Sequence, residues 1–283
     1  QPPIKPATPA SIARSFSSRG FEMVNQQSTP GNQQSGFTLI EMSIVLAIIG
    51  LVIGGIVAGQ SLVRAAQIRD MIGEFDSYVK AIKEFQDKYH ALPGDMNNAT
   101  IFWANTANGD GNGEIGTSSN TGTPTDTPGG LANSGEWFLA WQHLSDAGFV
   151  QGSFTGTYGA GGASEAVIGT NVPASRLSGG GWTLNYYLNT SGNVGLWSDQ
   201  YGHLLNFGGS VAKNYTIGGI LRPDEALSID QKIDDGMPGT GSIRAWRTSV
   251  LPKCTATDTS QTAQIYNIGD SNPDCALVFL LGF

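Results

Sequence analysis

The strongest constraint on this chain is an uninterrupted apolar segment from Phe37 to Gly59, whose 23 residues contain a single charge, Glu41. As an α-helix, the segment spans about 35 Å at roughly 1.5 Å per residue. That length is enough to cross a bilayer core of about 30 Å. The run is too long for an ordinary core helix and does not end in the small-residue cleavage site of a secretory signal. We therefore expect a membrane-spanning helix.

The same helix is expected to continue well beyond the apolar segment. No proline lies between residues 37 and 90, and Pro93 and Gly94 supply the stop. From residue 60 onward, apolar side chains recur at gaps of three and four, which is the spacing of one helical face. The pattern predicts a rod whose second half packs beneath a globular domain. The positions of this apolar stripe are Ile68, Ile72, Phe75, Val79, Ile82, Phe85 and Tyr89.

The remaining residues, 93–283, predict a globular domain of the α+β class, in which the long N-terminal helix packs on an antiparallel β-sheet. Residues 104–133 are rich in turn formers and predict a loop. A helix is expected from Ser134, as N-cap, to Ala147, with Gly148 past its end. Its Trp137, Trp141 and Leu144 share one face and are expected in the core. A second helix is expected from Pro223 to Asp234, and strands at 182–188, 194–197, 203–207, 242–246 and 275–281.

The residues around the start of the apolar segment resemble the type IV pilin and type II secretion pseudopilin signal. A polar leader, residues 1–36, precedes the apolar helix. The resemblance is confined to the signal and this helix, and the rest agrees in general architecture. Family leaders often end in basic residues, whereas Gln33, Gln34 and Ser35 stand here. Translation from Met23 would give a leader of ordinary length for the family, and we expect residues 1–22 to be an artefact of the start assignment. The matching residues are Gly36, Phe37, Thr38, Leu39, Ile40 and Glu41.

The resemblance implies that a prepilin peptidase cuts between Gly36 and Phe37 and methylates the new amine of Phe37. Gly36 has no side chain, which suits a tight protease subsite. Glu41 then pairs with the amine of a neighbouring subunit, and removing one partner from such a buried pair costs about 3–5 kcal/mol. The alternative for Glu41 is a carboxylate near the membrane edge that reaches water or stays protonated.

Four glycines of the apolar segment have the small-xxx-small spacing that lets membrane helices approach closely. They form two pairs, Gly50 with Gly54 and Gly55 with Gly59. The alternative is that glycine is simply common in membrane helices. Related sequences often carry a proline at the position of Ala58, so local melting of this helix is only weakly indicated.

The function implied by the resemblance is that of a structural subunit of a type IV pilus or pilus-like filament. Its partners are then the prepilin peptidase, other pilin or pseudopilin subunits and an inner-membrane assembly platform. The chain is expected in the inner membrane with its C-terminal domain outside the cytoplasm, and afterwards in an extracellular pilus or periplasmic pseudopilus. The parts are a leader (1–36), a transmembrane or filament-core helix (37–59), its amphipathic half (60–92) and the globular domain (93–283).

Two alternatives stay open, a minor or tip pseudopilin of a type II secretion system and a membrane-tethered binding domain. The chain from Phe37 exceeds a typical major pilin in length, which favours a specialised role. Outside the cytoplasm, Cys254 and Cys275 are expected to form a disulfide, and many type IV pilins close a C-terminal loop in this way. Two free buried thiols are the alternative.

One loop has the oxygen-ligand spacing that begins an EF-hand, with Asn108, Asp110 and Asn112 as calcium ligands. Ser119 stands at the twelfth position, where an EF-hand has glutamate, so a complete EF-hand is excluded. The alternative is an ordinary Asn/Gly turn. A second acidic group, Asp230, Asp234 and Asp235, is expected to end a helix rather than bind metal. Candidates to complete the calcium shell are Glu114, Asp126 and Glu136.

The composition and motifs favour neither nucleic-acid binding nor catalysis. The net charge is −8, whereas binding to DNA or to anionic lipid needs positive charge. The sequence has no G-x-S-x-G elbow, phosphate loop or H-E-x-x-H motif. Its three histidines, His90, His143 and His203, match no metal-binding spacing. We therefore expect a protein that is not an enzyme.

Overall fold

The computed structural model describes residues 36–116, 135–162, 164–187, 195–197, 200–246, 251, 253–256 and 264–283. The chain separates into two compact units, which are described one at a time: the first ends at Gly54 and the second begins at Gly55. Several expectations of the sequence fall outside the described residues, namely those on the leader before Gly36 and on Ser119, Asp126, Ser134, Leu188 and Val194.

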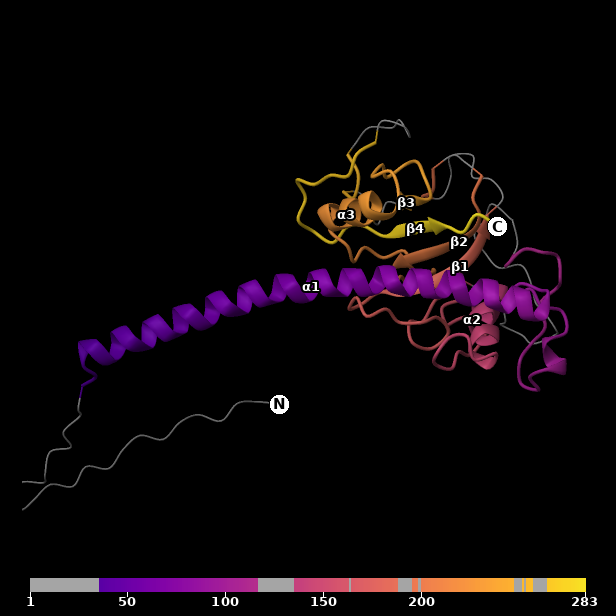
Figure 1. Ribbon diagram of the computed structural model, residues 1–283, viewed down its shortest axis with the longest axis horizontal. Helices are drawn as coiled ribbons and strands as arrows, with labels where there is room; N and C mark the ends of the chain where they lie inside the picture. The colour runs from indigo at the N-terminus through magenta and orange to yellow at the C-terminus, as the bar shows by residue number, and fades with distance from the viewer. Residues whose placement is uncertain are drawn as a thin grey trace, which may run out of the picture. The chain divides into compact units, whose positions relative to one another are not determined.

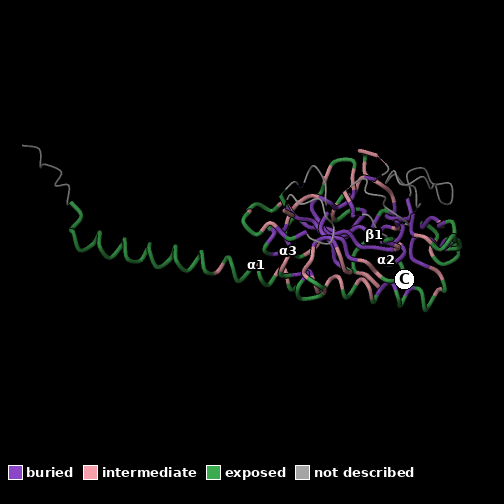
Figure 2. The backbone as a smooth tube through the Cα atoms, turned by 90° about the horizontal axis from the view of Figure 1, so that it is seen from above, coloured by how far each residue is buried: buried purple, intermediate pink, exposed green. Residues whose placement is uncertain are grey.

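The first unit consists, in its described part, of the apolar start of helix α1 (Leu39–Tyr89). Every residue from Gly36 to Gly54 is exposed (Figure 2). The most apolar 18-residue window of α1 has a mean hydropathy of 2.5, and none of it is buried. An exposed apolar surface of this extent marks a contact with lipid or with other protein. The expected helix is therefore present, and the residues that the structure describes leave its apolar surface uncovered.

In the second unit, α1 buries one face against the globular domain. Met71, Ala81, Ile82 and Phe85 are buried. The predicted apolar stripe is confirmed, because its other members are partly buried and none of them is exposed to the degree seen before Gly54. The partly buried members are Ile68, Ile72, Phe75, Val79 and Tyr89.

The sheet has four antiparallel strands in the order β1-β2-β4-β3 (Figure 1). They are β1 (Gly181–Tyr187), β2 (Gly202–Gly208), β3 (Ile243–Ala245) and β4 (Leu277–Leu280). In the register, Leu205 of β2 lies opposite both Leu184 of β1 and Phe279 of β4. Together with the long N-terminal helix, this sheet confirms the predicted α+β class.

Aromatic side chains join α1 to the sheet. The ring of Phe75 lies 4.7 Å from that of Phe279 on β4, measured between centroids, and Trp182 on β1 lies 4.6 Å from Phe207 on β2. Tyr78 meets Trp141 edge to face at 5.0 Å. Such pairs contribute about 0.5–1.5 kcal/mol each beyond the area that they bury. The core of this unit is therefore an aromatic layer between α1 and the sheet.

Helix α2 (Glu136–Asp146) lies against β1, and a single 3₁₀ turn, η1 (Ala99–Ile101), follows α1. Trp137, Trp141 and Leu144 are buried, which confirms their place in the core. Gly148 has a φ of +80° just past the helix, as expected for a C-terminal glycine. The predicted N-cap was wrong, because Gly135 caps α2 and offers no side chain for the purpose.

Helix α3 (Pro223–Ile233) contacts β3 and begins with proline, as its sequence predicts. The strand expected at 194–197 was wrong in its described part, because residues 195–197 form a turn and a bend. Trp197 is buried there and its indole Nε1 donates a hydrogen bond to the Ala245 carbonyl at 3.2 Å. The apolar run that suggested a strand is therefore an anchor for a connecting segment.

An ion pair ties α1 to α3. The Arg64 guanidinium donates from Nε to Oε1 of Glu225 at 2.8 Å and from Nη2 to Oε2 at 2.9 Å. Nη2 also donates to the Ile220 carbonyl at 2.6 Å. Glu225 is 5% exposed, so this bidentate pair is shielded from water on the acidic side.

A second carboxylate ties α1 to β1. Glu74 accepts hydrogen bonds from Ser175 Oγ at 2.6 Å, from the Arg176 backbone N–H at 2.7 Å and from Trp182 Nε1 at 3.0 Å. Three donors from the globular domain thus converge on one side chain of α1. The rotation of the helix about its own axis is fixed at this point.

Candidate processing and assembly site

The backbone before α1 has no regular secondary structure from Gly36 to Thr38. Gly36 is exposed, and a Cβ placed on it would meet no atom within 4 Å. Phe37 is 81% exposed. The peptide bond between Gly36 and Phe37 is therefore accessible, and nothing within the described chain requires glycine at position 36.

Thr38 and Glu41 form a reciprocal capping box at the start of α1. Glu41 Oε2 accepts hydrogen bonds from the Thr38 backbone N–H at 2.7 Å and from its Oγ1 at 2.8 Å. The Glu41 backbone N–H donates to Thr38 Oγ1 at 3.3 Å. Each side chain satisfies a backbone donor that the first helical turn leaves open. The sequence carries the signal for this motif, threonine followed three residues later by glutamate. Our sequence reasoning missed it and gave Glu41 a contact between subunits or, as the alternative, a place near the membrane edge.

The capping box places the Glu41 carboxylate against the backbone of the residue that follows Phe37. The amine that the sequence predicts on Phe37 after cleavage belongs to the residue directly before Thr38, whose backbone N–H donates to this carboxylate. Within one chain the carboxylate is already hydrogen-bonded, which lowers the cost of keeping it in an apolar segment. Any pairing with a neighbouring chain therefore competes with, or adds to, this local arrangement.

The four glycines of the two predicted packing pairs make no close contacts. A Cβ on Gly50, Gly54, Gly55 or Gly59 would meet no atom within 4 Å outside the helix's own backbone. All four lie within α1, where glycine is less favourable than alanine by about 1 kcal/mol. A single chain thus gives no steric reason for these glycines, and their role in helix packing stays a prediction.

Cys254 and Cys275 are joined in a disulfide, and both are fully buried. Cys275 also forms an isolated antiparallel bridge with Leu221, immediately before α3. The disulfide therefore ties Cys254 to the residue that leads into β4, and the bridge to Leu221 ties the same residue to the segment before α3.

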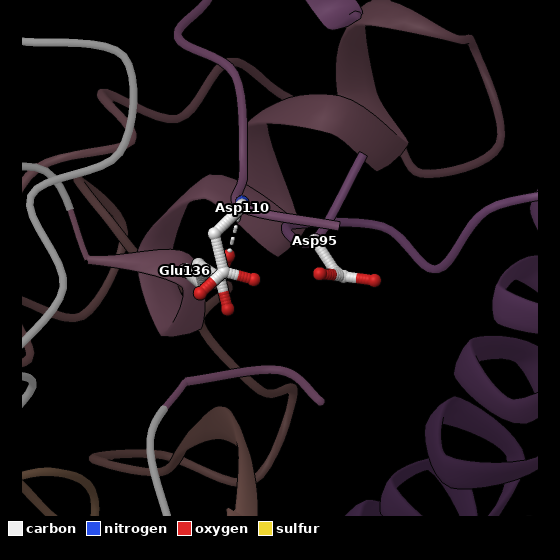
Figure 3. Close-up of side chains that lie close together, drawn as sticks. All are labelled: Asp95, Asp110 and Glu136. Atoms are coloured by element: carbon white, nitrogen blue, oxygen red, sulfur yellow. Dashed lines mark hydrogen bonds between the residues drawn. The ribbon is translucent and has the colours of Figure 1, made fainter. Parts of the chain in front are cut away.

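Three carboxylates meet beside the start of α2, from Asp95, Asp110 and Glu136 (Figure 3). Their oxygens lie within 4.8 Å of one another. Glu136 accepts from the backbone N–H groups of Asp110 at 2.9 Å and Gly116 at 2.7 Å. Asp95 accepts from the N–H groups of two residues in the glycine-rich loop, Asn112 and Gly113.

The pKa of Glu136 is raised to about 8. Burial is the largest cause, and the nearby charges of Asp110 and Asp95 also raise the pKa, whereas the two backbone hydrogen bonds lower it in part. Burial likewise raises the pKa of Asp95. A cluster of this kind needs either a proton or a cation to offset its negative charge.

The calcium ligands predicted from the sequence are only partly brought together. Asp110 lies in the carboxylate cluster with Glu136, which was among the candidates to complete the shell. Asn108 instead accepts a hydrogen bond from the Thr100 backbone N–H, and Asn112 bonds to Asp110 and to the Glu114 backbone. Our sequence reasoning missed Asp95, because it lies well before the loop in sequence and no local spacing links them.

Asp230, Asp234 and Asp235 also meet, at the C-terminal end of α3. Asp230 accepts from Tyr266 Oη at 2.8 Å and from the Gly236 N–H at 3.1 Å. Asp234 accepts from the Ile243 N–H at the start of β3. These bonds tie the end of α3 to its surroundings, in keeping with the helix-ending role expected for them.

No curated protein and no solved structure matches the chain. Residues 31–57 match the family model described as the prokaryotic N-terminal methylation motif. The matched segment contains Gly36, Phe37 and the Thr38–Glu41 capping box, and it runs into the exposed apolar part of α1. The chain therefore carries the prepilin signature of the type IV pilins and pseudopilins.

Proposed function

We propose that this chain is a structural subunit of a type IV pilus or pilus-like filament. A prepilin peptidase cuts it between Gly36 and Phe37 and methylates the new amine. The processed subunit leaves the inner membrane through an assembly platform and polymerises with other pilin subunits through the apolar part of α1.

One observation supports this proposal above all, the methylation motif followed directly by an apolar helix segment that none of the described residues covers. Apolar helix surface of this extent is unfavourable in contact with water, and it is stabilised when lipid or protein covers it. Membrane anchorage satisfies that need before assembly, and packing against other copies satisfies it in a filament. The same surface thus serves both states of the subunit.

The choice between a pilus and a secretion pseudopilus is a finer part of the proposal. We favour a pilus-like filament in which the chain is a minor or specialised subunit, because the residues from Phe37 onward form a longer chain than a typical major pilin. The globular second unit is then the part of the subunit available for contacts of its own.

The cleavage step is tested by mass spectrometry of the N-terminus after co-expression with a prepilin peptidase. We expect a mature chain that begins with N-methylated Phe37. A Gly36→Val variant should remain uncleaved, because a branched side chain is excluded from a subsite fitted to glycine. The exposed position of Gly36 means that the substitution has no steric consequence within the described chain.

A Ser35→Val variant is the matched control, since it adds a similar side chain one residue before the cleavage site. It should be processed at a rate close to that of the unaltered chain. Efficient cleavage of the Gly36→Val variant, or failure of the unaltered chain to be cut by its own cognate peptidase, would count against the proposed function.

A further inference from the structure

A surface pocket of about 270 Å³ lies between α1 and α3, within the second unit. Figures 1 and 2 show α3 beside the turns of α1 where this helix joins the globular domain. The described lining of the pocket combines three apolar side chains with one hydroxyl group and two cationic side chains, and it contains no carboxylate. The lining residues are Ala65, Ile68, Arg69, Ile72, Ser228 and Lys232.

The two cations of the pocket, Arg69 and Lys232, are exposed, and neither side chain forms an ion pair or hydrogen bond with the described residues. The three arginines nearest to them on α1, α3 and the segment before β1 are each paired with a carboxylate. Two positive charges therefore remain uncompensated at the pocket, although the chain as a whole carries a net charge of −8. The compensated pairs are Arg64 with Glu225, Arg176 with Asp70 and Arg222 with Asp224.

The acidic residues that follow Lys232 are bonded to the chain leading into β3. Asp234 accepts a hydrogen bond from the Ile243 backbone N–H at 3.0 Å, and Asp235 accepts one from the Met237 backbone N–H at 2.8 Å. Neither carboxylate lines the pocket. The pocket therefore has a positive local field, which favours a negatively charged partner.

The pocket begins directly after the exposed apolar surface of α1. In the second unit this surface continues to Leu62 and Val63, which are both exposed. Along the helix axis, Ala65 lies about 3 Å beyond Val63 and Ile72 about 14 Å beyond it, at roughly 1.5 Å per residue. The headgroup layer of a bilayer is about 5–7 Å thick on each side of the hydrocarbon core. A membrane that covers the apolar residues up to Val63 therefore brings lipid headgroups to the pocket.

An anionic phospholipid uses every part of this lining. Its phosphate accepts charge-assisted hydrogen bonds from a guanidinium and an ammonium group, and Ser228 offers a further donor. Its glycerol and first acyl carbons lie against Ala65 and Ile68. A choline headgroup carries its own cation, which the two basic side chains repel. A carboxylate from a second copy of the chain uses the cations but leaves the apolar part of the lining uncovered.

We propose that the pocket between α1 and α3 binds the headgroup of an anionic phospholipid, with Arg69 and Lys232 on its phosphate. The proposal rests on the membrane anchorage that the proposed function includes, and it requires neither cleavage at Gly36 nor polymerisation. It is tested on the uncleaved chain, so its failure is distinguishable from a failure of processing.

The test measures lipid binding to the full chain in maltoside micelles, whose sugar headgroups contain no phosphate. Dioctanoyl phosphatidylglycerol, dioctanoyl phosphatidylcholine and inorganic phosphate are titrated separately, and native mass spectrometry counts the molecules bound per chain. We expect one phosphatidylglycerol to bind with a Kd on the order of 0.1 mM, and the other two ligands to bind about tenfold more weakly or less. Equal binding of phosphatidylcholine or of inorganic phosphate would overturn the proposal.

A charge variant and its control test the two cations. The double variant Arg69→Gln, Lys232→Gln should bind phosphatidylglycerol about tenfold more weakly or less. The control Lys83→Gln, Lys213→Gln removes the same charge from two exposed positions outside the pocket, and its affinity should stay unchanged. An unchanged affinity in the first variant, or an equal loss in the control, would contradict the assignment.

A second pair of variants tests the pocket itself. Ala65→Leu fills it and leaves both cations in place, so we expect phosphatidylglycerol binding to weaken about fivefold or more. Ala66→Leu adds the same side chain at an exposed neighbouring position outside the pocket and should bind normally. Equal affinities of these two variants would mean that the cations attract lipid without a pocket. A two-chain species that is lost in the Arg69→Gln, Lys232→Gln variant, without preference for phosphatidylglycerol, would assign the pocket to a second copy and overturn the proposal.

Discussion

At the scale of single residues, Glu41 has two separable features, a hydrogen-bonding carboxyl group and a charge. Its capping box with Thr38 uses only the ability to accept hydrogen bonds, which the amide oxygen of glutamine also provides. Pairing with a cationic amine on a neighbouring subunit uses the charge. Substitutions at this position can therefore distinguish a role in helix capping from a role in assembly.

We predict that Glu41→Gln and Glu41→Ala are both processed but both give few filaments. The alanine variant also loses the cap, which costs about 0.5–2 kcal/mol of helix stability, whereas glutamine keeps it. The measurement is filament yield from sheared cells, normalised to processed subunit in the membrane. Normal yield from Glu41→Gln would show that the charge is not needed and that capping is the whole role.

The raised pKa of Glu136 predicts that the stability of the fold decreases as the pH rises. Its pKa is raised by burial from 4.5 to about 8 in the folded chain, while Asp95 and Asp110 face it with like charge. A group whose pKa is raised by folding stabilises the fold fully below its unfolded pKa and loses that contribution as the pH rises through its folded pKa. In the presence of a chelator, the urea midpoint should therefore fall between about pH 5 and about pH 8.

The Glu136→Gln variant is the control for this pH dependence, since it cannot ionise. Its midpoint should vary less over the same pH range, whatever its absolute stability. The calcium hypothesis from the sequence adds a second arm, because a bound cation would replace the proton. Calcium should then remove the loss of stability at high pH in the unaltered chain. Equal slopes for both chains would contradict the assignment to Glu136.

At the scale of elements, the Arg64–Glu225 pair is expected to hold α1 to α3. Burial alone would raise the pKa of Glu225, but hydrogen bonds from the Arg64 side chain and the Arg222 backbone outweigh it and leave the pKa below its ordinary value. The resulting stability is present above about pH 4.5 and is lost as the pH falls through the lowered pKa.

We predict that Arg64→Ala destabilises the second unit by roughly 1.5–3 kcal/mol at neutral pH, the range for hydrogen bonds to charged groups. Lys80→Ala is the matched control on the same helix, because the Lys80–Glu84 pair is exposed and 3.6 Å apart. Its effect should stay below about 0.5 kcal/mol. Chemical denaturation of the two variants measures both values, and similar losses would mean that the buried pair has no special weight.

The disulfide belongs to the same scale, since it constrains the C-terminal segment rather than one contact. Cys254 and Cys275 are 21 residues apart in sequence. Replacing both by alanine should lower stability by about 3 kcal/mol, mostly through greater freedom of the unfolded chain. Thermal unfolding with and without reductant checks this, and reductant should have no effect on the double variant. An unchanged melting temperature would contradict the prediction.

At the scale of the whole molecule, the sequence predicts those features of the fold that depend on the local spacing of apolar residues. The course of α1, its apolar stripe and the α+β class follow from spacings of three, four and two. The strand at 194–197 was wrong because a short apolar run also suits a buried anchor such as Trp197. The cap at Ser134 was wrong because Gly135 begins α2 without a side-chain cap.

The candidate sites differ in how far the sequence alone predicts them. The prepilin signature could be recognised from the sequence, because Gly36, Phe37 and Glu41 are consecutive or nearly so, and the roles of these residues in processing and assembly stay predictions. The carboxylate cluster was found only in part, since Asp95 and Glu136 come together through the fold.

The central claim is that the processed chain is part of a filament, and the most direct measurement is mass spectrometry of filaments sheared from cells that express it. The account predicts that these filaments contain the chain, that it begins at N-methylated Phe37, and that it is absent from the sheared fraction when Glu41 is alanine. Processed chain confined to the membrane fraction, with none in filaments, would contradict the account and leave a membrane-anchored domain instead.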